Sequence, residues 1–210
     1  MSNNLGLALV RKLHARLVHE RRIAVLAHQL SAFLRPGWQV LDVGCGDGKL
    51  AGILCDLIPN LQIRGVEVLI RPDCRIQCES YDGMHLPFAD DSFDACLIVD
   101  VLHHATDPLA VLTDAGRISR ECVLIKDHIA ENAVDRWTLR FMDVVGNRPH
   151  GVSIPARYLS SSAWREMCIR SDLVPGTMST DIALYPFPFS MLFGRQLHLI
   201  VQLKTTKKMC

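Results

Sequence analysis

The sequence lacks several features that would fix a class of function at once. Neither sign of charge is in excess, because the 210 residues have a net charge of +1 and the sequence pI is about 7.6. Proteins that bind nucleic acid over a broad surface usually have a basic face and a high pI, so we expect no nucleic-acid partner. No apolar run approaches the length needed to cross a bilayer.

None of the eight cysteines forms a Cys-x-x-Cys pair, the spacing typical of zinc ribbons and redox motifs. Cysteines inside apolar runs, such as Cys96 and Cys122, are expected to be reduced and to act as small hydrophobic side chains. Cys74 and Cys78 with a distant histidine pair have poor metal-ligand spacing, so we expect no metal. The apolar run at 5–10 is too short for a signal-peptide core and follows no charged residue. This predicts a cytoplasmic protein.

The first 38 residues differ in charge from the rest of the chain. They contain six Lys or Arg and a single acid, Glu20, which gives this segment a net charge of +5. Apolar residues at helical spacing across 5–34 predict helices there, and Pro36-Gly37 ends them. We therefore expect a helical extension over 1–37 and one domain over 38–204.

From residue 39 onward, the pattern alternates between expected strands and expected helices. Such alternation predicts an α/β fold with a parallel sheet covered on both faces. Two strands near the C-terminus break the alternation and fit an antiparallel addition to the sheet. The expected strands are 39–43, 62–66, 75–79, 94–99, 122–126, 177–183 and 196–203, and the expected helices are 49–57, 108–118, 132–144 and 161–170.

The most informative stretch is 40–48, Val-Leu-Asp-Val-Gly-Cys-Gly-Asp-Gly. An apolar strand leads into three alternating glycines and then a helix whose free N–H groups face the loop, which predicts a nucleotide-like ligand. A dinucleotide fingerprint would need glycine at its sixth position, where Lys49 stands. No Gly-Lys-Ser/Thr triad is present. The carboxylate of Asp42 repels a pyrophosphate and suits a cation, so the electrostatics favour S-adenosylmethionine, which has a sulfonium and an ammonium group.

A second anchor follows the next strand. Glu67 stands 19 positions after Gly48, and an acid about 20 residues beyond such glycines accepts hydrogen bonds from ribose hydroxyls. We expect this role for Glu67.

These residues resemble a known family, the class I S-adenosylmethionine-dependent methyltransferases of the small-molecule group called type 11. The resemblance covers residues 38–130 closely, through the glycine motif, Glu67, the run 86–94 and the motif Val99-Asp100-Val101-Leu102-His103-His104. It implies a Rossmann-like doubly wound sheet of seven strands, order 3-2-1-4-5-7-6, with the last strand antiparallel. It also implies a set of cofactor-binding residues, among which Asp82 would hold the adenine amine: Asp42, Gly44, Cys45, Gly46, Gly48, Glu67, Asp82, Gly83 and Asp100.

Candidate acceptor-side residues follow the expected fourth and fifth strands. His103 follows the fourth strand, while Asp127 and His128 end the fifth, and histidine suits proton transfer near neutral pH. We expect His128, then His103, to act on the acceptor, with Asp127 beside them. Arg148 in a polar turn is a candidate lid residue, with a solvated loop as the alternative.

Two tyrosines and one apolar connection are further candidates near the acceptor. Tyr158 and Tyr185 are candidates for lining the acceptor pocket, or for the edge of the core. The segment 184–193 is unusually apolar. It is either an added layer of core, or it covers an apolar acceptor, inserts into a membrane surface or joins a partner subunit.

The sequence therefore predicts methyl transfer from S-adenosylmethionine to a small metabolite, apolar or lipid-like, with peripheral membrane contact as a further expectation. Two alternatives stay open: an NAD(P)-dependent oxidoreductase, against which the missing glycine and the lack of a Tyr-x-x-x-Lys pair count, and a non-catalytic S-adenosylmethionine-binding module. The acceptor atom and the oligomeric state are not determined.

Overall fold

The structure is a computed structural model that describes residues 20–147, 157–185, 187, 189–194 and 196–206. The helices expected before residue 20 and the expected lid residue Arg148 lie outside these ranges.

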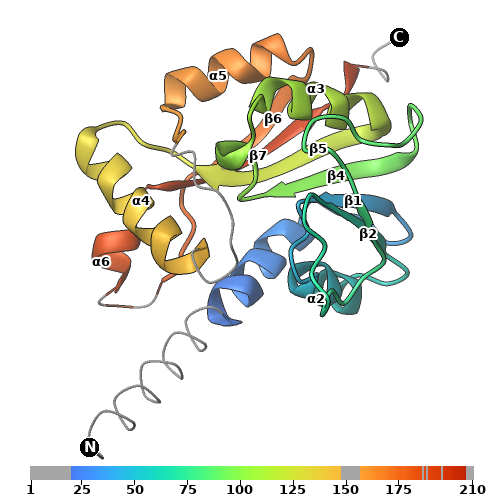
Figure 1. Ribbon diagram of the computed structural model, residues 1–210, viewed down its shortest axis with the longest axis horizontal. Helices are drawn as coiled ribbons and strands as arrows, with labels where there is room; N and C mark the ends of the chain where they lie inside the picture. Colours follow the sequence, from blue (N-terminus) through green and yellow to red (C-terminus); the bar gives the residue numbers. More distant parts are fainter. Residues whose placement is uncertain (1–19, 148–156, 186, 188, 195, 207–210) are drawn as a thin grey trace, which may run out of the picture.

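A seven-stranded sheet forms the centre of the molecule (Figure 1). Its strand order is β3-β2-β1-β4-β5-β7-β6, and β7 is antiparallel to both β5 and β6. The order and the antiparallel last strand expected from the resemblance are thus confirmed. The strands are β1 (Gln39–Val43), β2 (Gln62–Glu67), β3 (Cys78–Ser80), β4 (Phe93–Val99), β5 (Ser119–His128), β6 (Val174–Ser179) and β7 (His198–Lys204).

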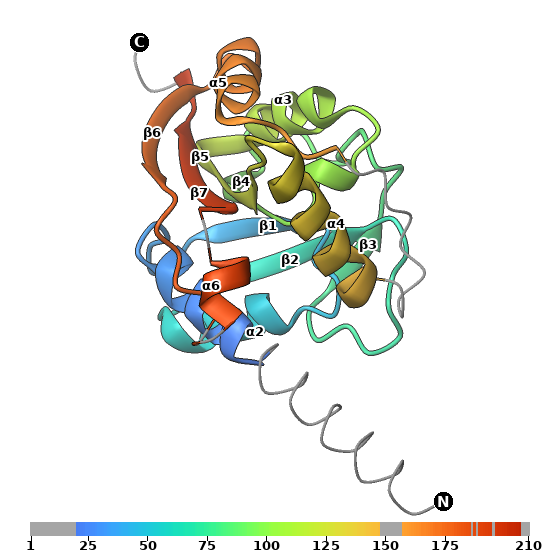
Figure 2. The same cartoon turned by 90° about the vertical axis from the view of Figure 1, so that its left-hand side faces the viewer.

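Helices cover both faces of the sheet, as both views show (Figures 1 and 2). The helical residues 20–31 and α2 pack on one face, and α3 and α5 pack on the other. Strand alternation divides the core, since Val40 faces the first pair of helices whereas Leu41 and Val43 face the second. The helix bounds are α2 (Lys49–Leu57), α3 (Pro108–Ile118), α4 (Ala133–Asn147), α5 (Ser161–Arg170) and α6 (Phe189–Phe193), with a 3-10 turn η1 at Leu102–His104.

The N-terminal helix belongs to this core. Leu26, Ala27 and Leu30 are buried against β1 and α2, in one cluster with Leu54. Residues 20–31 therefore pack against the sheet of the α/β domain. The domain boundary expected after residue 37 falls at the turn formed by Pro36 and Gly37.

Three segments differ from the sequence expectation. β5 begins three residues earlier and ends two later than expected, because its polar end residues pair with β4 and β7. β3 lies at 78–80 instead of 75–79, and the crossover before it, residues 68–77, contains no helix. β6 lies three to four residues before its expected position.

Helix α4 has two unlike faces. Leu139 and Asp143 point inward and are buried. On the opposite side, four apolar side chains recur at helical spacing and are 36–71% exposed, namely Val134, Trp137, Phe141 and Val144. We call these four the outer stripe of α4. None of the helices in the described ranges is long and apolar enough to cross a bilayer.

The segment 184–193 is divided between core and surface. Leu184 is fully buried, while Phe187 is 79% and Met191 65% exposed. The prolines at 186 and 188 lie outside the described residues, and the short helix α6 follows them.

Candidate active site

The glycine loop after β1 is shaped by three left-handed residues. Gly44, Gly46 and Gly48 have φ values of 71°, 59° and 69°, a region that side chains with a Cβ rarely adopt. At Gly44 a Cβ would also lie 2.4 Å from a methyl group of Val101. Gly48 caps α2, so the free N–H groups of that helix face the loop.

Glu67 ties this loop to the end of β2. Its carboxylate accepts hydrogen bonds from the backbone N–H of Gly46, at 2.9 Å, and of Val68, at 3.0 Å. Each carboxylate oxygen has further acceptor capacity. The expected contact of Glu67 with a ribose stays a prediction.

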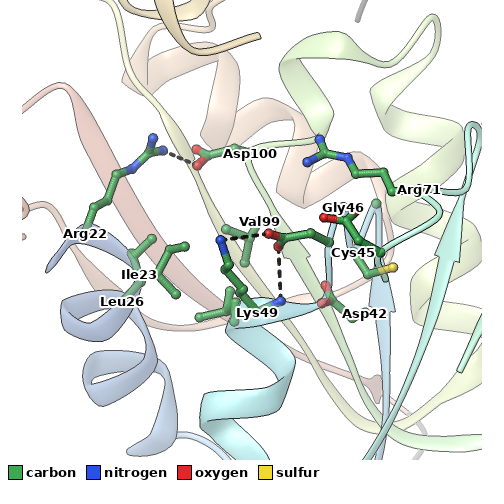
Figure 3. Close-up of a pocket in the computed structure, with 14 residues that line it drawn as sticks. Arg22, Ile23, Leu26, Asp42, Cys45, Gly46, Lys49, Arg71, Val99 and Asp100 are labelled. Carbon is green, nitrogen blue, oxygen red and sulfur yellow. Dashed lines mark hydrogen bonds and ion pairs between the residues drawn. The ribbon is translucent and has the colours of Figure 1, made fainter. Parts of the chain in front are cut away.

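A cavity of about 540 Å³ lies above the loop (Figure 3). Its volume is in the range of small-molecule and cofactor sites. Figure 3 shows Arg22 and Arg71 reaching toward it from opposite sides. Helix 20–31, the glycine loop with the start of α2, the 68–77 crossover and the end of β4 contribute its lining: Arg22, Ile23, Leu26, Asp42, Gly44, Cys45, Gly46, Asp47, Lys49, Leu50, Arg71, Asp73, Val99 and Asp100.

Asp42 is the most buried acid of the lining, with 2% of its surface exposed. Burial, together with the nearby charge of Glu67, raises the pKa of Asp42 to about 8. The carboxyl group therefore holds a proton at neutral pH until a cation arrives to compensate its charge.

Asp100 connects the cavity to the interior. Its carboxylate pairs with the ammonium group of Lys126 and the guanidinium of Arg22, and Lys126 is fully buried in β5. Burial alone would raise the pKa of Asp100, but the two cations hold it well below its usual value. The carboxylate of Asp100 therefore stays ionised. The backbone of Asp100 is left-handed, with a φ of 56°.

The expected acceptor-side residues come together in one buried cluster. Asp127 accepts a hydrogen bond from His103 Nδ1 at 2.6 Å and another from the backbone N–H of His128 at 2.7 Å. The rings of His103 and His128 lie 4.7 Å apart, edge to face. Asp143 of α4 lies 3.5 Å from His103 Nε2, and it accepts the hydroxyl hydrogen of Tyr158.

The two histidines of the cluster differ in charge preference. Burial lowers the pKa of His103, but attraction to Asp127 outweighs it, so the pKa lies above its ordinary value. Burial and the charge of Lys126 lower the pKa of His128. His128 is therefore neutral at pH 7, the state that a base requires. Both side chains are only 3% exposed.

Other expected site residues lie away from the cavity lining. The side chain of Asp82 is 58% exposed, and it accepts hydrogen bonds from the backbone N–H of Met84 and His85. Gly83, at a φ of 85°, forms the same turn. Their expected role at the adenine stays a prediction. The ring of Tyr185 lies 5.9 Å from that of His198, beside the cluster.

Sequence reasoning gave no site role to five charged residues of the lining, namely Arg22, Asp47, Lys49, Arg71 and Asp73. Asp47 and Lys49 lie in the glycine motif or directly after it. For Arg71 and Asp73, only their proximity to Glu67 in the chain could have drawn attention to them. Cys45 lines the cavity as expected, but its Sγ points toward Cys78, 3.5 Å away.

With this geometry described, the chain can be compared with known proteins. Residues 41–122 match the family described as a methyltransferase domain. A 27-O-demethylrifamycin SV methyltransferase of Amycolatopsis mediterranei is 31% identical over 100 residues, which cover 41% of this chain and 36% of that protein. The chain thus spans about a third of the length of this curated relative.

Solved structures share the fold over nearly the whole chain. The putative methyltransferase of Haloferax volcanii, solved with the Trm112 methyltransferase activator, has a TM-score of 0.68 at 19% identity and covers 89% of this chain and 90% of its own. An S-adenosylmethionine-dependent methyltransferase of Thermotoga maritima has a TM-score of 0.64 at 17% identity, with 98% and 100% covered.

The sheet order, the glycine loop and these matches define a Rossmann-like methyltransferase fold. Residues 41–122 form a methyltransferase domain, and the fold is that of the S-adenosylmethionine-dependent methyltransferases among the solved structures.

The buried cluster generates one prediction. The variant Asp127→Asn keeps the size of the side chain and removes the charge that favours protonated His103. The pKa of His103 lies above 6.5 in the wild type. We expect it to fall in the variant, because burial lowers this pKa and the charge of Asp127 no longer raises it. An NMR titration of the imidazole C–H signals measures this shift, and His103→Gln identifies the resonance.

Asp82→Asn is the matched control, because its carboxylate contacts His85 and lies outside the cluster. It should leave the titration of His103 unchanged. A His103 pKa that is the same in Asp127→Asn and in the wild type would contradict the assignment.

Proposed function

We propose that this protein transfers a methyl group from S-adenosylmethionine to an oxygen of a small metabolite that has an apolar part. The single observation that supports the donor is the cavity above the glycine loop, where the buried carboxyl group of Asp42 faces a space of about 540 Å³. An oxygen acceptor is supported by the relative that acts on 27-O-demethylrifamycin SV.

The residues around the cavity fit such a donor. Gly44 has a left-handed conformation and lines the cavity, so its backbone is open to a ligand without a side chain between them. Asp42 and Asp47 supply negative charge for a sulfonium and an ammonium group, and Glu67 and Asp82 would reach the ribose and the adenine. When bound, S-adenosylmethionine supplies an electrophilic methyl group with a neutral thioether as the leaving group.

The acceptor-side residues provide the proton transfer that a hydroxyl nucleophile needs. Neutral His128 takes the proton, and Asp127 orients the imidazole of His103 beside it through the 2.6 Å hydrogen bond. Tyr158 and Asp143 close the cluster on the α4 side. The enzyme otherwise aligns the reactants and excludes water.

We also propose that the outer stripe of α4 contacts an anionic membrane surface. Trp137 is 71% and Phe141 51% exposed, and their rings lie 6.1 Å apart in a stacked arrangement. Arg136 and Arg140, both exposed, lie in the same helix, which suits anionic headgroups. The inner face of α4 contacts the buried cluster through Asp143. Membrane contact would therefore bring an apolar acceptor close to the acceptor-side residues.

The proposed activity is tested with S-adenosylmethionine labelled with tritium in its methyl group. We expect the wild type to bind the donor and to incorporate label into a small molecule of a cell extract. Gly44→Ala should lose both, because the new Cβ would clash with Val101 and favour another backbone conformation. Gly52→Ala is the matched control, since a Cβ at Gly52 of α2 would meet no atom within 4 Å.

Three other outcomes would contradict this proposal. Donor binding without incorporation would favour the non-catalytic module. Binding of NADH without binding of S-adenosylmethionine would favour the oxidoreductase. Equal activity of Gly44→Ala and Gly52→Ala would remove the glycine loop from the donor site.

The pKa of Asp42 predicts how donor affinity depends on pH. Below pH 8, the Asp42 carboxyl must lose its proton when a cation binds. We therefore expect the Kd of S-adenosylmethionine to rise as pH falls from 8 to 6, by up to about tenfold per pH unit. Isothermal calorimetry measures this slope.

Asp42→Asn has no proton to release, so its affinity should be weaker and its slope flatter. The uncharged nucleoside 5′-methylthioadenosine should show no tightening with rising pH in the wild type. If Asp42→Asn retained the wild-type slope, another group would control the pH dependence.

The membrane contact is tested by cosedimentation with vesicles that contain anionic phospholipid. The double variant Trp137→Ser/Phe141→Ser should bind the vesicles several-fold less than the wild type, because it removes most of the outer stripe. Ile169→Ser is the control, since Ile169 of α5 is also 71% exposed but lies on another helix. Equal loss in both variants, or no vesicle binding by the wild type, would contradict the proposal.

A further inference from the structure

The 68–77 crossover has little packing to hold it in place. It contains no helix, and its first three residues, Val68, Leu69 and Ile70, are 44–69% exposed. Yet Arg71 and Asp73 of this crossover line the cavity. Its position above the glycine loop therefore depends on a few specific links, of which the hydrogen bond from Arg75 N–H to the Asp47 carbonyl is one, at 3.1 Å.

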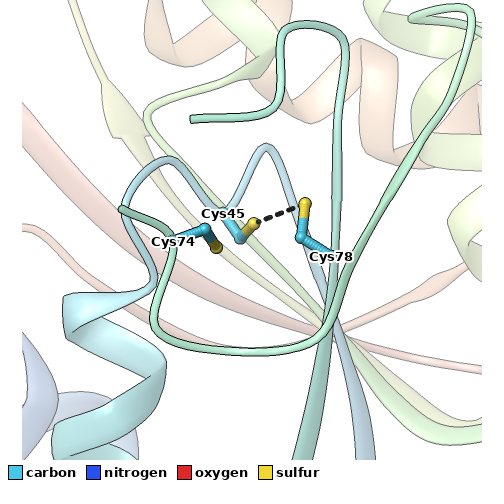
Figure 4. A group of neighbouring side chains, drawn as sticks. All are labelled: Cys45, Cys74 and Cys78. Carbon is cyan, nitrogen blue, oxygen red and sulfur yellow. Dashed lines mark hydrogen bonds between the residues drawn. The ribbon is translucent and has the colours of Figure 1, made fainter. Parts of the chain in front are cut away.

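Three cysteines meet where the crossover approaches the glycine loop (Figure 4). Cys45 lies in the loop, Cys74 in the crossover and Cys78 at the start of β3. Their Sγ atoms all lie within 4.8 Å of one another, and those of Cys45 and Cys78 are 3.5 Å apart. Cys74 and Cys78 are four positions apart, and from this pair alone we expected no metal, because Cys45 comes from a distant segment and joins them only through packing.

The chain leaves space for the central thiol. Gly65 lies in the middle of β2, where a Cβ would come within 2.4 Å of Cys45 Sγ. Glycine weakens a strand interior and often marks a place where another group approaches closely. The glycine at 65 allows the Cys45 side chain to turn beneath the loop toward the other two thiols.

We propose that Cys45, Cys74 and Cys78 form a three-thiolate site for a zinc ion, which ties the glycine loop to the crossover and β3. Zinc–sulfur bonds of about 2.3 Å in tetrahedral geometry place sulfur atoms ~3.8 Å apart, close to the separations found here. All three side chains are half-buried, so an ion has a path to them. The fourth zinc position takes water.

The site needs three thiols, which separates it from a disulfide. A disulfide would join two of them at an S–S distance of about 2.05 Å, and the third thiol would take no part in the bond. Zinc binding replaces three S–H bonds by three Zn–S bonds and releases three protons to solvent. Burial raises the pKa of the Cys45 and Cys78 thiols, so these protons are present at neutral pH. Arg71 and Arg75 supply positive charge on the same crossover.

The zinc ion would hold one wall of the donor cavity in place, and the test of the site does not use enzymatic activity. The reduced full chain, first treated with a chelator, is titrated with Zn2+ by calorimetry in two buffers of different ionisation enthalpy. We expect one ion per chain, about three protons released, and a higher midpoint of thermal unfolding with zinc. Co2+ as a probe should give a thiolate-to-metal charge-transfer band.

The variants Cys74→Ser and Cys78→Ser should lose stoichiometric zinc and the cobalt band. Cys55→Ser is the matched control, because Cys55 is also half-buried but lies in α2 outside the cluster, and it should bind as the wild type does. In the wild type itself, zinc should protect Cys45, Cys74 and Cys78 from alkylation, as mapped by mass spectrometry, while leaving Cys55 reactive.

The proposal fails if the reduced wild type binds no zinc stoichiometrically, or if Cys74→Ser and Cys55→Ser bind equally. It also fails if zinc leaves the alkylation of the three cysteines unchanged. The alkylation map uses only the wild type. It can therefore still contradict the proposal if the Cys74→Ser variant does not fold.

Discussion

The buried ammonium group of Lys126 is the constraint on which both halves of the site depend. A fully buried lysine in the middle of a sheet is costly unless an anion compensates it, and Asp100 at the end of the neighbouring strand β4 does so. Arg22 shares the same carboxylate, so helix 20–31 is bound to the sheet by charge as well as by Leu26 and Leu30. On the cavity side, this network fixes Arg22 and Asp100 in the lining. On the side of the buried cluster, burial and then the charge of Lys126 lower the pKa of His128. One cation in β5 thus contributes to the charge of the cavity lining and of the cluster.

The sequence was sufficient for the parts of the fold that depend on local pattern. β1, β4, α2 and α3 were expected within one residue of their observed bounds, because apolar periodicity, glycine and a proline at the first turn of a helix act over a few neighbouring residues. The limits of β5 were missed because Ser119 and His128 are polar and gain strand structure only from partners on both sides. The links between residues 22, 100 and 126, or between Cys45 and the pair Cys74 and Cys78, arise only when distant segments pack, and no single-sequence pattern records them.

The acids around the donor cavity also show the limit of reading charge from sequence. Asp42, Asp82 and Glu67 look alike in a motif, but burial makes Asp42 hold its proton up to a pKa of about 8. Asp82 is more than half exposed, and three hydrogen bonds with its own turn lower its pKa to about 2. Glu67 binds the backbone of the loop that Asp42 supports. Burial and hydrogen bonding, which the sequence does not give, thus assign different charge states to Asp42 and Asp82.

His103 and His128 illustrate the same principle at the place where chemistry is proposed. Both are equally buried, so desolvation disfavours the cation in each. His103 faces Asp127 and Asp143, and attraction to them raises its pKa. The pKa of His128 falls, because burial and the charge of Lys126 outweigh the attraction of Asp100 and Asp127. The charged form of His103 therefore stabilises the fold below its unfolded pKa, and that contribution is lost as pH rises through the folded value. His128 acts in the opposite sense, since its neutral form is favoured and its contribution is lost as pH falls. When neighbours drive the pKa values of two histidines apart, one can hold a proton while the other accepts one. In this cluster the difference follows from the attraction of Asp127 for His103 and from burial and the charge of Lys126 at His128.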